Sequence, residues 1–284
     1  RLQSFNLDSL IVLGGYPAGG GTDEERDWKC NKTILSGEIQ EDGDNSNNSY
    51  HVVVTVDAGF NSTVVDGFCI VDGNANAIDL EEFQNGGGWK NINTPGNTSS
   101  PLILHCQFSN NYAAGRGGAF YNLDSSGTCF PVFVNSIFSG NKAAYGGAIG
   151  NSAYDGSGNI GFENCILSGN FATIDGAAIF NLTMLNGIAN LSAYNTLFSG
   201  NATGIAMVCS GGAVYNASED NSTSINNTFR NCTFWNNFSS DGLVFFHETG
   251  VSAISYNIFQ TDLMAKQYRF RYSICKIFNF NFEY

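Results

Sequence analysis

The carboxylates are the residues of this chain best suited to catalysis, and their spacing is not that of a catalytic site. Hydrolases that cleave polysaccharides need two or three carboxylates converging on one face, for acid, base or nucleophilic roles. Between residues 125 and 210 the only acidic residues are Asp155, Glu163 and Asp175, at different positions of the repeat described below. Elsewhere acidic residues cluster in short runs, namely Asp23-Glu24-Glu25 with Asp27, Glu41-Asp42 with Asp44, Glu81-Glu82 and Glu219-Asp220. We predict that the chain is not an enzyme, and a polysaccharide lyase or hydrolase is the least favoured of three functions.

Metal ligands follow no complete pattern. Asp42-Gly43-Asp44 resembles half of a calcium loop, without the glutamate that would complete it. Calcium near Asp42 and Asp44 is therefore a weak prediction, and no other cofactor is expected. The three histidines lie in separate segments and no Cys-x-x-Cys pair occurs, which excludes the common zinc patterns.

The eight cysteines allow two interpretations. An even number favours disulfides in an oxidising compartment, and this is the interpretation we prefer. Alternatively, Cys106, Cys165 and Cys232 share one position of the repeat, as small residues that fill an interior would.

Asparagine supplies the third kind of chemistry, the attachment of glycans. The chain holds twelve Asn-x-Ser/Thr sequons, where chance would give about five or six. Asn201 and Asn237 are set aside because they belong to a ladder predicted below to point inward. The candidates for glycosylation are Asn31, Asn47, Asn61, Asn97, Asn181, Asn190, Asn216, Asn221, Asn226 and Asn231. This excess predicts an extracellular glycoprotein with covalent glycans.

A short repeat underlies all of these positions. A step of small residues begins at residues 87, 117, 146, 176, 211 and 241, so the intervals are 30, 29, 30, 35 and 30. About twenty residues after most steps a second signature follows, as in Phe138-Ser139-Gly140-Asn141, and short β-prone runs precede it. Self-similarity at this period predicts a solenoid. Glycine and asparagine are too dense for a helical repeat.

Two or three short strands in thirty residues form one coil of a parallel β-helix, in which equivalent residues of successive coils stack about 4.8 Å apart. The apolar heads of the second signature are then an interior column: Phe108, Phe138, Leu167, Phe198 and Phe234. Its last residues form an asparagine ladder at a turn: Asn111, Asn141, Asn170, Asn201 and Asn237. A second set of asparagines follows the glycine step, at Asn91, Asn122, Asn151, Asn181 and Asn216. All of these are predicted to be scaffold.

The composition of the chain restricts the classes of partner that it can bind. The chain has 284 residues, 34 glycines, 13% charged residues and a formal net charge of −13. So negative a chain is a poor ligand for nucleic acid or for an anionic membrane. No apolar run is long enough for a membrane-spanning helix. The first residue is Arg1, and we expect a processed chain whose export signal has been removed.

The repeat signatures resemble those of a known family. Gly146-Gly147-Ala148-Ile149 and the Phe-x-x-Asn motif resemble the repeats of chlamydial polymorphic outer-membrane proteins. Residues 13–21, 33–37 and 65–68 are similar to the start of secreted β-helix proteins of Bacteroidetes. The resemblance covers roughly residues 10–262. It implies a right-handed parallel β-helix, displayed or secreted outside the cell and acting in adhesion or surface structure.

The C-terminal segment has a period of two. Its aromatic and apolar residues share one parity: Tyr268, Phe270, Tyr272, Ile274, Phe278, Phe280, Phe282 and Tyr284. This alternation predicts one extended strand. It either caps the last coil of its own chain or pairs with a neighbouring subunit, as an open-ended solenoid invites.

The sequence thus predicts an all-β protein, a right-handed parallel β-helix with coils of about 30 residues and an extended C-terminal strand. We expect an N-terminal cap at residues 1–30, the β-helix at 31–262 and the joining strand at 263–284. The favoured function is a secreted, glycosylated structural protein, whose copies assemble head-to-tail into an extracellular filament or surface layer. The alternative is a cell-surface adhesin that binds glycans or host surfaces.

Overall fold

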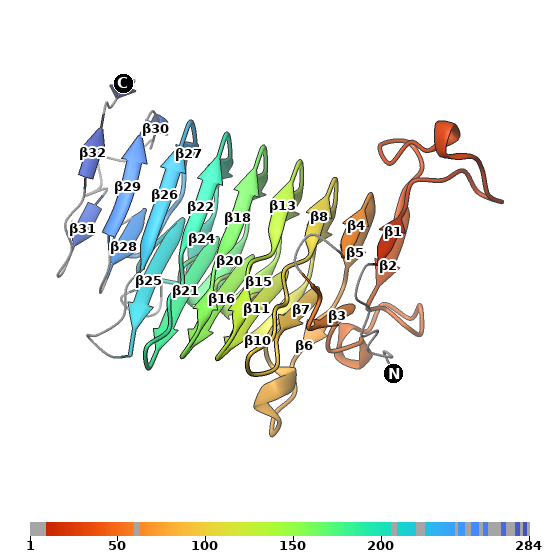
Figure 1. Ribbon diagram of the computed structural model, residues 1–284, viewed down its shortest axis with the longest axis horizontal. Coiled ribbons are helices and arrows are strands. Elements are labelled where there is room, and N and C mark those ends of the chain that lie inside the picture. Colours follow the sequence, from red (N-terminus) through yellow and green to blue (C-terminus); the bar gives the residue numbers. More distant parts are fainter. Residues whose placement is uncertain are drawn as a thin grey trace.

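The protein is a β-solenoid, seen here in a computed structural model (Figure 1). The structure describes residues 10–59, 63–205, 209–219, 225–241, 244–247, 251–255, 258–260, 268–270, 276–278 and 281–282. In these residues there is no α-helix, and three short 3-10 helices lie in loops: η1 (Asp23–Glu25), η2 (Asn45–Asn47) and η3 (Glu81–Phe83).

Successive coils contribute one strand each to three long sheets, in the order A, B, C along the chain. Sheet A contains β1 (Ile11–Leu13), β4 (Val64–Asp66), β8 (Leu102–Leu104), β13 (Val132–Val134), β18 (Ile160–Glu163), β22 (Leu191–Tyr194), β26 (Asn226–Arg230), β29 (Val251–Ser255) and β32 (Lys276–Phe278). Sheet B contains β2 (Thr33–Ser36), β5 (Phe68–Val71), β9 (Gln107–Ser109), β14 (Ile137–Ser139), β19 (Ile166–Ser168), β23 (Leu197–Ser199), β27 (Thr233–Trp235), β30 (Ile258–Gln260) and β33 (Asn281–Phe282). Sheet C contains β3 (Val53–Val56), β7 (Trp89–Ile92), β11 (Phe120–Ser125), β16 (Ile149–Tyr154), β21 (Ile179–Met184), β25 (Val214–Ser218), β28 (Phe245–His247) and β31 (Tyr268–Phe270).

Two smaller sheets are formed by strands that lie between those of the three long sheets along the chain. Sheet D, between B and C, contains β6 (Asn74–Ala75), β10 (Tyr112–Arg116), β15 (Lys142–Tyr145), β20 (Phe171–Asp175) and β24 (Ala202–Thr203). A two-stranded sheet E pairs β12 (Thr128–Cys129) with β17 (Ser157–Gly158). Neighbouring strands pair in parallel, so the predicted parallel β-helix is confirmed.

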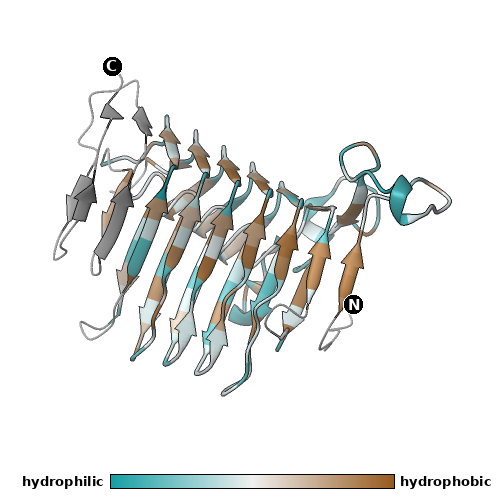
Figure 2. Ribbon diagram, turned by 45° about the horizontal axis from the view of Figure 1, so that its top comes forward, coloured by the Kyte–Doolittle hydropathy of each residue, from teal (hydrophilic) through white to brown (hydrophobic). Residues whose placement is uncertain are grey.

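Like residues lie over one another, as the repeat predicts. In sheet B, Phe108 is in register with Phe138, and Phe138 with Leu167. The rings of Phe108 and Phe138 stack with centroids 4.7 Å apart and planes 7° from parallel. The file continues through Phe198 and Phe234, and all five side chains are buried. Figure 2 shows hydrophobic stretches recurring on successive strands, as this stacking requires.

The second signature is explained by the turn that follows each strand of sheet B. The residue before each ladder asparagine has a left-handed backbone, with φ of 56° at Asn110 and 65° at Gly140. Glycine and asparagine adopt this conformation at little cost, which is why only they occupy the position. The turn then directs the next asparagine into the interior.

The glycine step marks a close approach of successive coils. Gly146 has φ of 63°, and a Cβ added to Gly147 would lie 2.5 Å from the carbonyl oxygens of Ala177 and Phe171. No side chain fits at that distance without moving the backbone.

Both ends differ from the predicted boundaries. Strand β1 lies inside the predicted cap and pairs with β4, so sheet A begins at Ile11. The C-terminal segment is not one extended strand: β31, β32 and β33 join sheets C, A and B separately. A period of two cannot reveal this, because several short strands alternate just as one long strand does. Tyr268, Phe270, Phe278 and Phe282 lie in these strands, whereas Tyr272, Ile274, Phe280 and Tyr284 lie outside the described residues.

Candidate functional site

The two sets of asparagines that recur with the repeat both form continuous interior ladders. In the first, the Asn111 amide donates to Oδ1 of Asn141 at 3.0 Å and to the carbonyl oxygen of Ile70 at 3.0 Å. The pattern recurs at Asn141, Asn170 and Asn201 and ends on Asn237. Each Oδ1 also accepts from the backbone of the preceding rung, for example from Asn111 N at 3.1 Å. Because nearly every donor and acceptor is used inside, this ladder is scaffold.

The second ladder overturns two of the glycosylation candidates. It runs along sheet C, where Asn91 donates to Asn122, Asn122 to Asn151 and so on through Asn181 to Asn216. Asn181 and Asn216 have no exposed surface. A glycan on either nitrogen would have to lie in the core, so both predictions are wrong. A sequon does not report which face of a strand its asparagine occupies.

The other sequons differ in what their side-chain nitrogens contact. Asn97, Asn226 and Asn231 are exposed, whereas Asn31, Asn47 and Asn190 are half-buried. The Nδ2 groups of Asn31 and Asn47 donate to Gly15 O and Asp42 Oδ2. That of Asn97 donates to Asp57 and Thr94. Asn61 and Asn221 lie outside the described residues.

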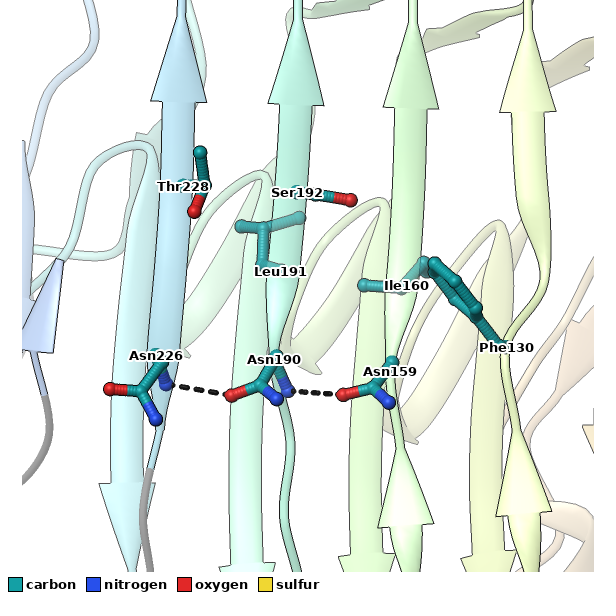
Figure 3. A pocket seen from close by; sticks show the side chains of 8 residues that line it. All are labelled: Phe130, Asn159, Ile160, Asn190, Leu191, Ser192, Asn226 and Thr228. Atoms are coloured by element: carbon teal, nitrogen blue, oxygen red, sulfur yellow. Dashed lines mark hydrogen bonds between the residues drawn. The ribbon is translucent and has the colours of Figure 1, made fainter. Parts of the chain in front are cut away.

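A groove of about 290 Å³ lies on the outer face of sheet A (Figure 3). Three asparagines form one side of it: the backbone NH of Asn190 donates to Asn159 Oδ1 at 3.1 Å, and that of Asn226 to Asn190 Oδ1 at 2.8 Å. The remaining lining residues are Phe130, Ile160, Leu191, Ser192 and Thr228. None of the eight lining side chains is charged, so this groove fits an uncharged ligand.

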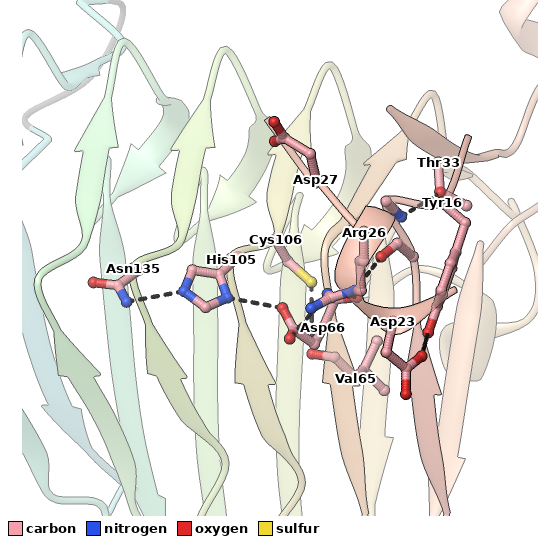
Figure 4. Close-up of polar contacts among 12 residues, drawn as sticks. Tyr16, Asp23, Arg26, Asp27, Thr33, Val65, Asp66, His105, Cys106 and Asn135 are labelled. Carbon is pink, nitrogen blue, oxygen red and sulfur yellow. Dashed lines mark hydrogen bonds and ion pairs between the residues drawn. The ribbon is translucent and has the colours of Figure 1, made fainter. Parts of the chain in front are cut away.

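A polar cluster fastens the N-terminal loop to the outer face of the solenoid (Figure 4). The Arg26 guanidinium contacts Asp66 Oδ2 at 2.9 Å and donates to the Gly14 carbonyl. The other Asp66 oxygen lies 2.8 Å from His105 Nδ1, and the His105 ring stacks on Trp28 with centroids 4.5 Å apart. This Arg26–Asp66–His105 cluster has an aspartate and a histidine in contact, yet both serve to anchor the loop.

The calcium prediction rests on a loop that uses its carboxylates internally. Asp42 accepts from the backbone of Asp44 and from the Asn47 side chain. Hydrogen bonds from the side chain and the backbone NH of Ser46 lower the pKa of the Asp44 carboxyl. Among the described residues no group of three or more histidine, cysteine and acidic side chains is arranged to hold a metal.

The cysteines correct the preferred interpretation. All seven cysteines in the described part of the chain are free thiols, and Cys275 lies outside it. Cys106 and Cys165 are buried in the main core, where loss of water raises the pKa of each thiol to about 12. The structure therefore shows the alternative interpretation, in which Cys106 and Cys165 are small residues that fill the interior. An even count misled because buried thiols can recur with the repeat without pairing.

Two buried titratable groups, His51 and Asp124, carry no signal in the sequence. His51 is buried with Nδ1 2.9 Å from the Gly86 carbonyl oxygen, and burial lowers its pKa to about 4. Asp124 is fully buried in sheet C, where loss of water raises the pKa of its carboxyl. Nothing in the sequence distinguished them from the other histidines and acidic residues of the chain. His105 did carry a signal, since it shares its left-handed turn position with Asn135, Asn164, Asn195 and Asn231.

Comparison with known proteins matches one segment of the chain to a family of repeats. Residues 105–123, from the turn at His105 through most of β11, match the model of the Chlamydia polymorphic membrane protein repeat. No curated protein and no solved structure matches the chain significantly. In the described residues no helix has the length and apolar character needed to cross a membrane. A repeat of this kind on a β-solenoid fits a protein of the cell surface or outer membrane.

Proposed function

We propose that this chain is a surface-displayed structural protein whose copies join head-to-tail through the ends of the solenoid. The observation that carries the proposal is the N-terminal end of the sheets. Ile11 in β1 is 64% exposed and Ile34 in β2 is 60% exposed, and these are the terminal strands of sheets A and B in the described chain. Terminal strands present hydrogen-bonding groups to any strand that approaches.

The positions of charged residues along the chain also support a head-to-tail arrangement of copies. Lys266, Arg269, Arg271 and Lys276 are four of the chain's twelve basic residues and lie near its C-terminal end. The N-terminal end carries the exposed acidic residues of η1. Copies that stack in the same direction would bring this basic C-terminal segment of one copy towards the acidic residues of η1 in the next. A contact between unlike ends does not close on itself and continues as a filament.

Electron microscopy and sedimentation of the purified chain test this proposal. We expect filaments or a concentration-dependent series of oligomers. Ile34→Lys places a charge on the terminal strand of sheet B and should leave mostly monomers, as should removal of residues 263–284. The matched control is Ile78→Lys, since Ile78 is 90% exposed in a loop beside the solenoid. A wild-type chain that stays monomeric at all concentrations would contradict the proposal.

Secretion and glycosylation belong to the same proposal. Asn97, Asn226 and Asn231 are the best-exposed candidates in the described chain. Mass spectrometry of peptides from native protein, before and after glycan removal, should find glycans on some of these and none on Asn181 or Asn216. Catalysis is not part of the proposal, because Asp155, Glu163 and Asp175 follow or end three strands in three different sheets.

A second candidate is an adhesin that binds glycans or host surfaces. It is favoured by the uncharged groove on sheet A, which the assembly proposal does not use. Protein-coated beads should then adhere to glycan-bearing cells, and adhesion should not require filaments.

A further inference from the structure

The groove on the outer face of sheet A has the composition of a carbohydrate site, and we propose that it binds a neutral saccharide. This inference rests on the adhesin candidate and names its ligand class. On a chain with a formal net charge of −13, none of the eight side chains that line the groove is charged. A charged ligand would lose its hydration there and gain no opposite charge. Hydroxyl groups, by contrast, match amides and hydroxyls.

Asn190, the middle one of the three asparagines along one side of the groove, supplies a fixed hydrogen-bond donor (Figure 3). Its Oδ1 accepts from the backbone of Asn226 at 2.8 Å, and its own backbone NH donates to Asn159 Oδ1 at 3.1 Å. These two bonds set the orientation of the amide. Its Nδ2 group donates to no residue that the structure describes, so it is available to an acceptor without prior rearrangement.

Two hydroxyl groups line the opposite side of the groove. Ser192 in β22 is in register with Thr228 in β26, one coil further along. Both side chains are half-exposed, and neither hydroxyl has a hydrogen-bond partner among the described residues. A hydroxyl both donates and accepts, as a sugar hydroxyl does.

An aromatic ring closes one end. A Cβ added to Gly161 would lie 3.4 Å from Cε2 of Phe130 and 3.5 Å from Ser192 Oγ, so the ring borders the space that Gly161 leaves empty. The apolar face of a sugar ring packs against such an aromatic surface. A few polar groups beside one apolar wall is the usual composition of small-molecule sites.

The spacing of the three groove asparagines indicates how a long ligand would lie in the groove. Asn159, Asn190 and Asn226 lie in successive coils, which are about 4.8 Å apart along the axis. A linear oligosaccharide lying parallel to the axis would therefore meet an amide at each coil. The saccharide has two sources, a free chain or a glycan on Asn190 itself, since Asn190-Leu191-Ser192 is a sequon.

Calorimetry on the full chain made in a host without N-glycosylation tests the free source. The probes are tetrasaccharides of β-linked glucose and of N-acetylglucosamine, with a galacturonic acid tetramer as the charged comparison. We expect binding of a neutral probe. Ser192→Phe, which fills the groove, and Asn190→Ala, which removes the donor, should each weaken it at least about tenfold. Ser199→Phe makes the same substitution on sheet B of the same coil and should leave binding unchanged.

Mass spectrometry of Asn190 peptides from native protein tests the attached source, and a glycan there supports the proposal. Equal or tighter binding of the acidic tetramer, or neutral binding unaffected by both groove variants, would overturn it. So would the absence of both neutral binding and a glycan on Asn190. If protein-coated beads adhere equally well with wild type and Ser192→Phe, the adhesin candidate stands and this site fails.

Discussion

In the coils from β8 to β23 the core side chains and the asparagine ladder repeat from coil to coil, whereas the first two coils also carry contacts that have no equivalent elsewhere in the described chain. Phe138 and Asn141 each have an equivalent above and below them. The Arg26–Asp66–His105 cluster and the buried His51 have none. Both regions use the same solenoid backbone, so the difference lies in the side chains.

This difference determines how far a substitution should act. A member of a file contacts two neighbouring coils, and each coil depends on its neighbours for its core. A gap in a file therefore weakens the whole array. A contact that occurs only once holds a single loop in place, or makes the stability of one region depend on a condition such as pH. The variants below test this distinction, in order of expected effect.

Phe138→Ala should have the largest effect. It removes a fully buried ring from between Phe108 and Leu167 and leaves a cavity, which costs about 3–5 kcal/mol of unfolding free energy. Phe138→Leu should cost about 1–2 kcal/mol, because Leu167 already occupies the same file. Urea unfolding followed by circular dichroism measures both. Equal losses from the two substitutions would mean that the file tolerates no change of shape.

Asn141→Ala should rank second. It removes the acceptor of Asn111 N and Nδ2 and the donor to Phe108 O, leaving buried groups unpaired at a cost of about 3 kcal/mol. Lys142→Ala changes the adjacent, exposed residue and should alter stability by less than about 0.5 kcal/mol. The same urea titration compares them. A small loss at Asn141 would show that water replaces the ladder bonds.

The repeated contacts were predictable from the sequence and the unique ones were not. Phe138 and Asn141 recur at a fixed interval, and a stacked fold is the physical reason for such recurrence. Arg26, Asp66 and His105 are brought together across 79 positions, with no repetition to mark the contact. No short motif in the sequence indicates that these three side chains meet.

The candidate site was predictable only in part. Asn190 was predicted as a sequon, but the groove depends on the register of Ser192 with Thr228 and on the gap at Gly161. Asn181 shows the converse. Its membership of the second asparagine set already indicated burial, and that repeat position was a better guide than the three-residue sequon.

His51 should make the first coils sensitive to acid. Its folded pKa of about 4 lies below the ordinary value of 6.5, so the unfolded chain binds the proton more tightly. The stability present above pH 6.5 is therefore lost as the pH falls towards 4, by about 2–3 kcal/mol. His51→Gln cannot titrate and should show a flatter dependence of melting temperature on pH over this range. Parallel curves for the two proteins would exclude His51 as the cause.

Asp66→Asn should have the smallest effect on global stability and a clear local one. The amide keeps the size of the carboxylate but loses the charge that pairs with Arg26, and one of its two oxygens becomes a nitrogen. A partly buried pair of this kind contributes about 1 kcal/mol, and here it fastens only the loop that carries Trp28. Trypsin should therefore cut after Arg26, Lys29 and Lys32 several times faster, while the urea midpoint barely moves. Asp155→Asn, at an exposed turn remote from this loop, should change neither measurement. If Asp66→Asn lowers the unfolding free energy as much as Asn141→Ala does, the cluster supports the array itself, because a contact that only fastens a loop can be lost without unfolding the coils beneath it.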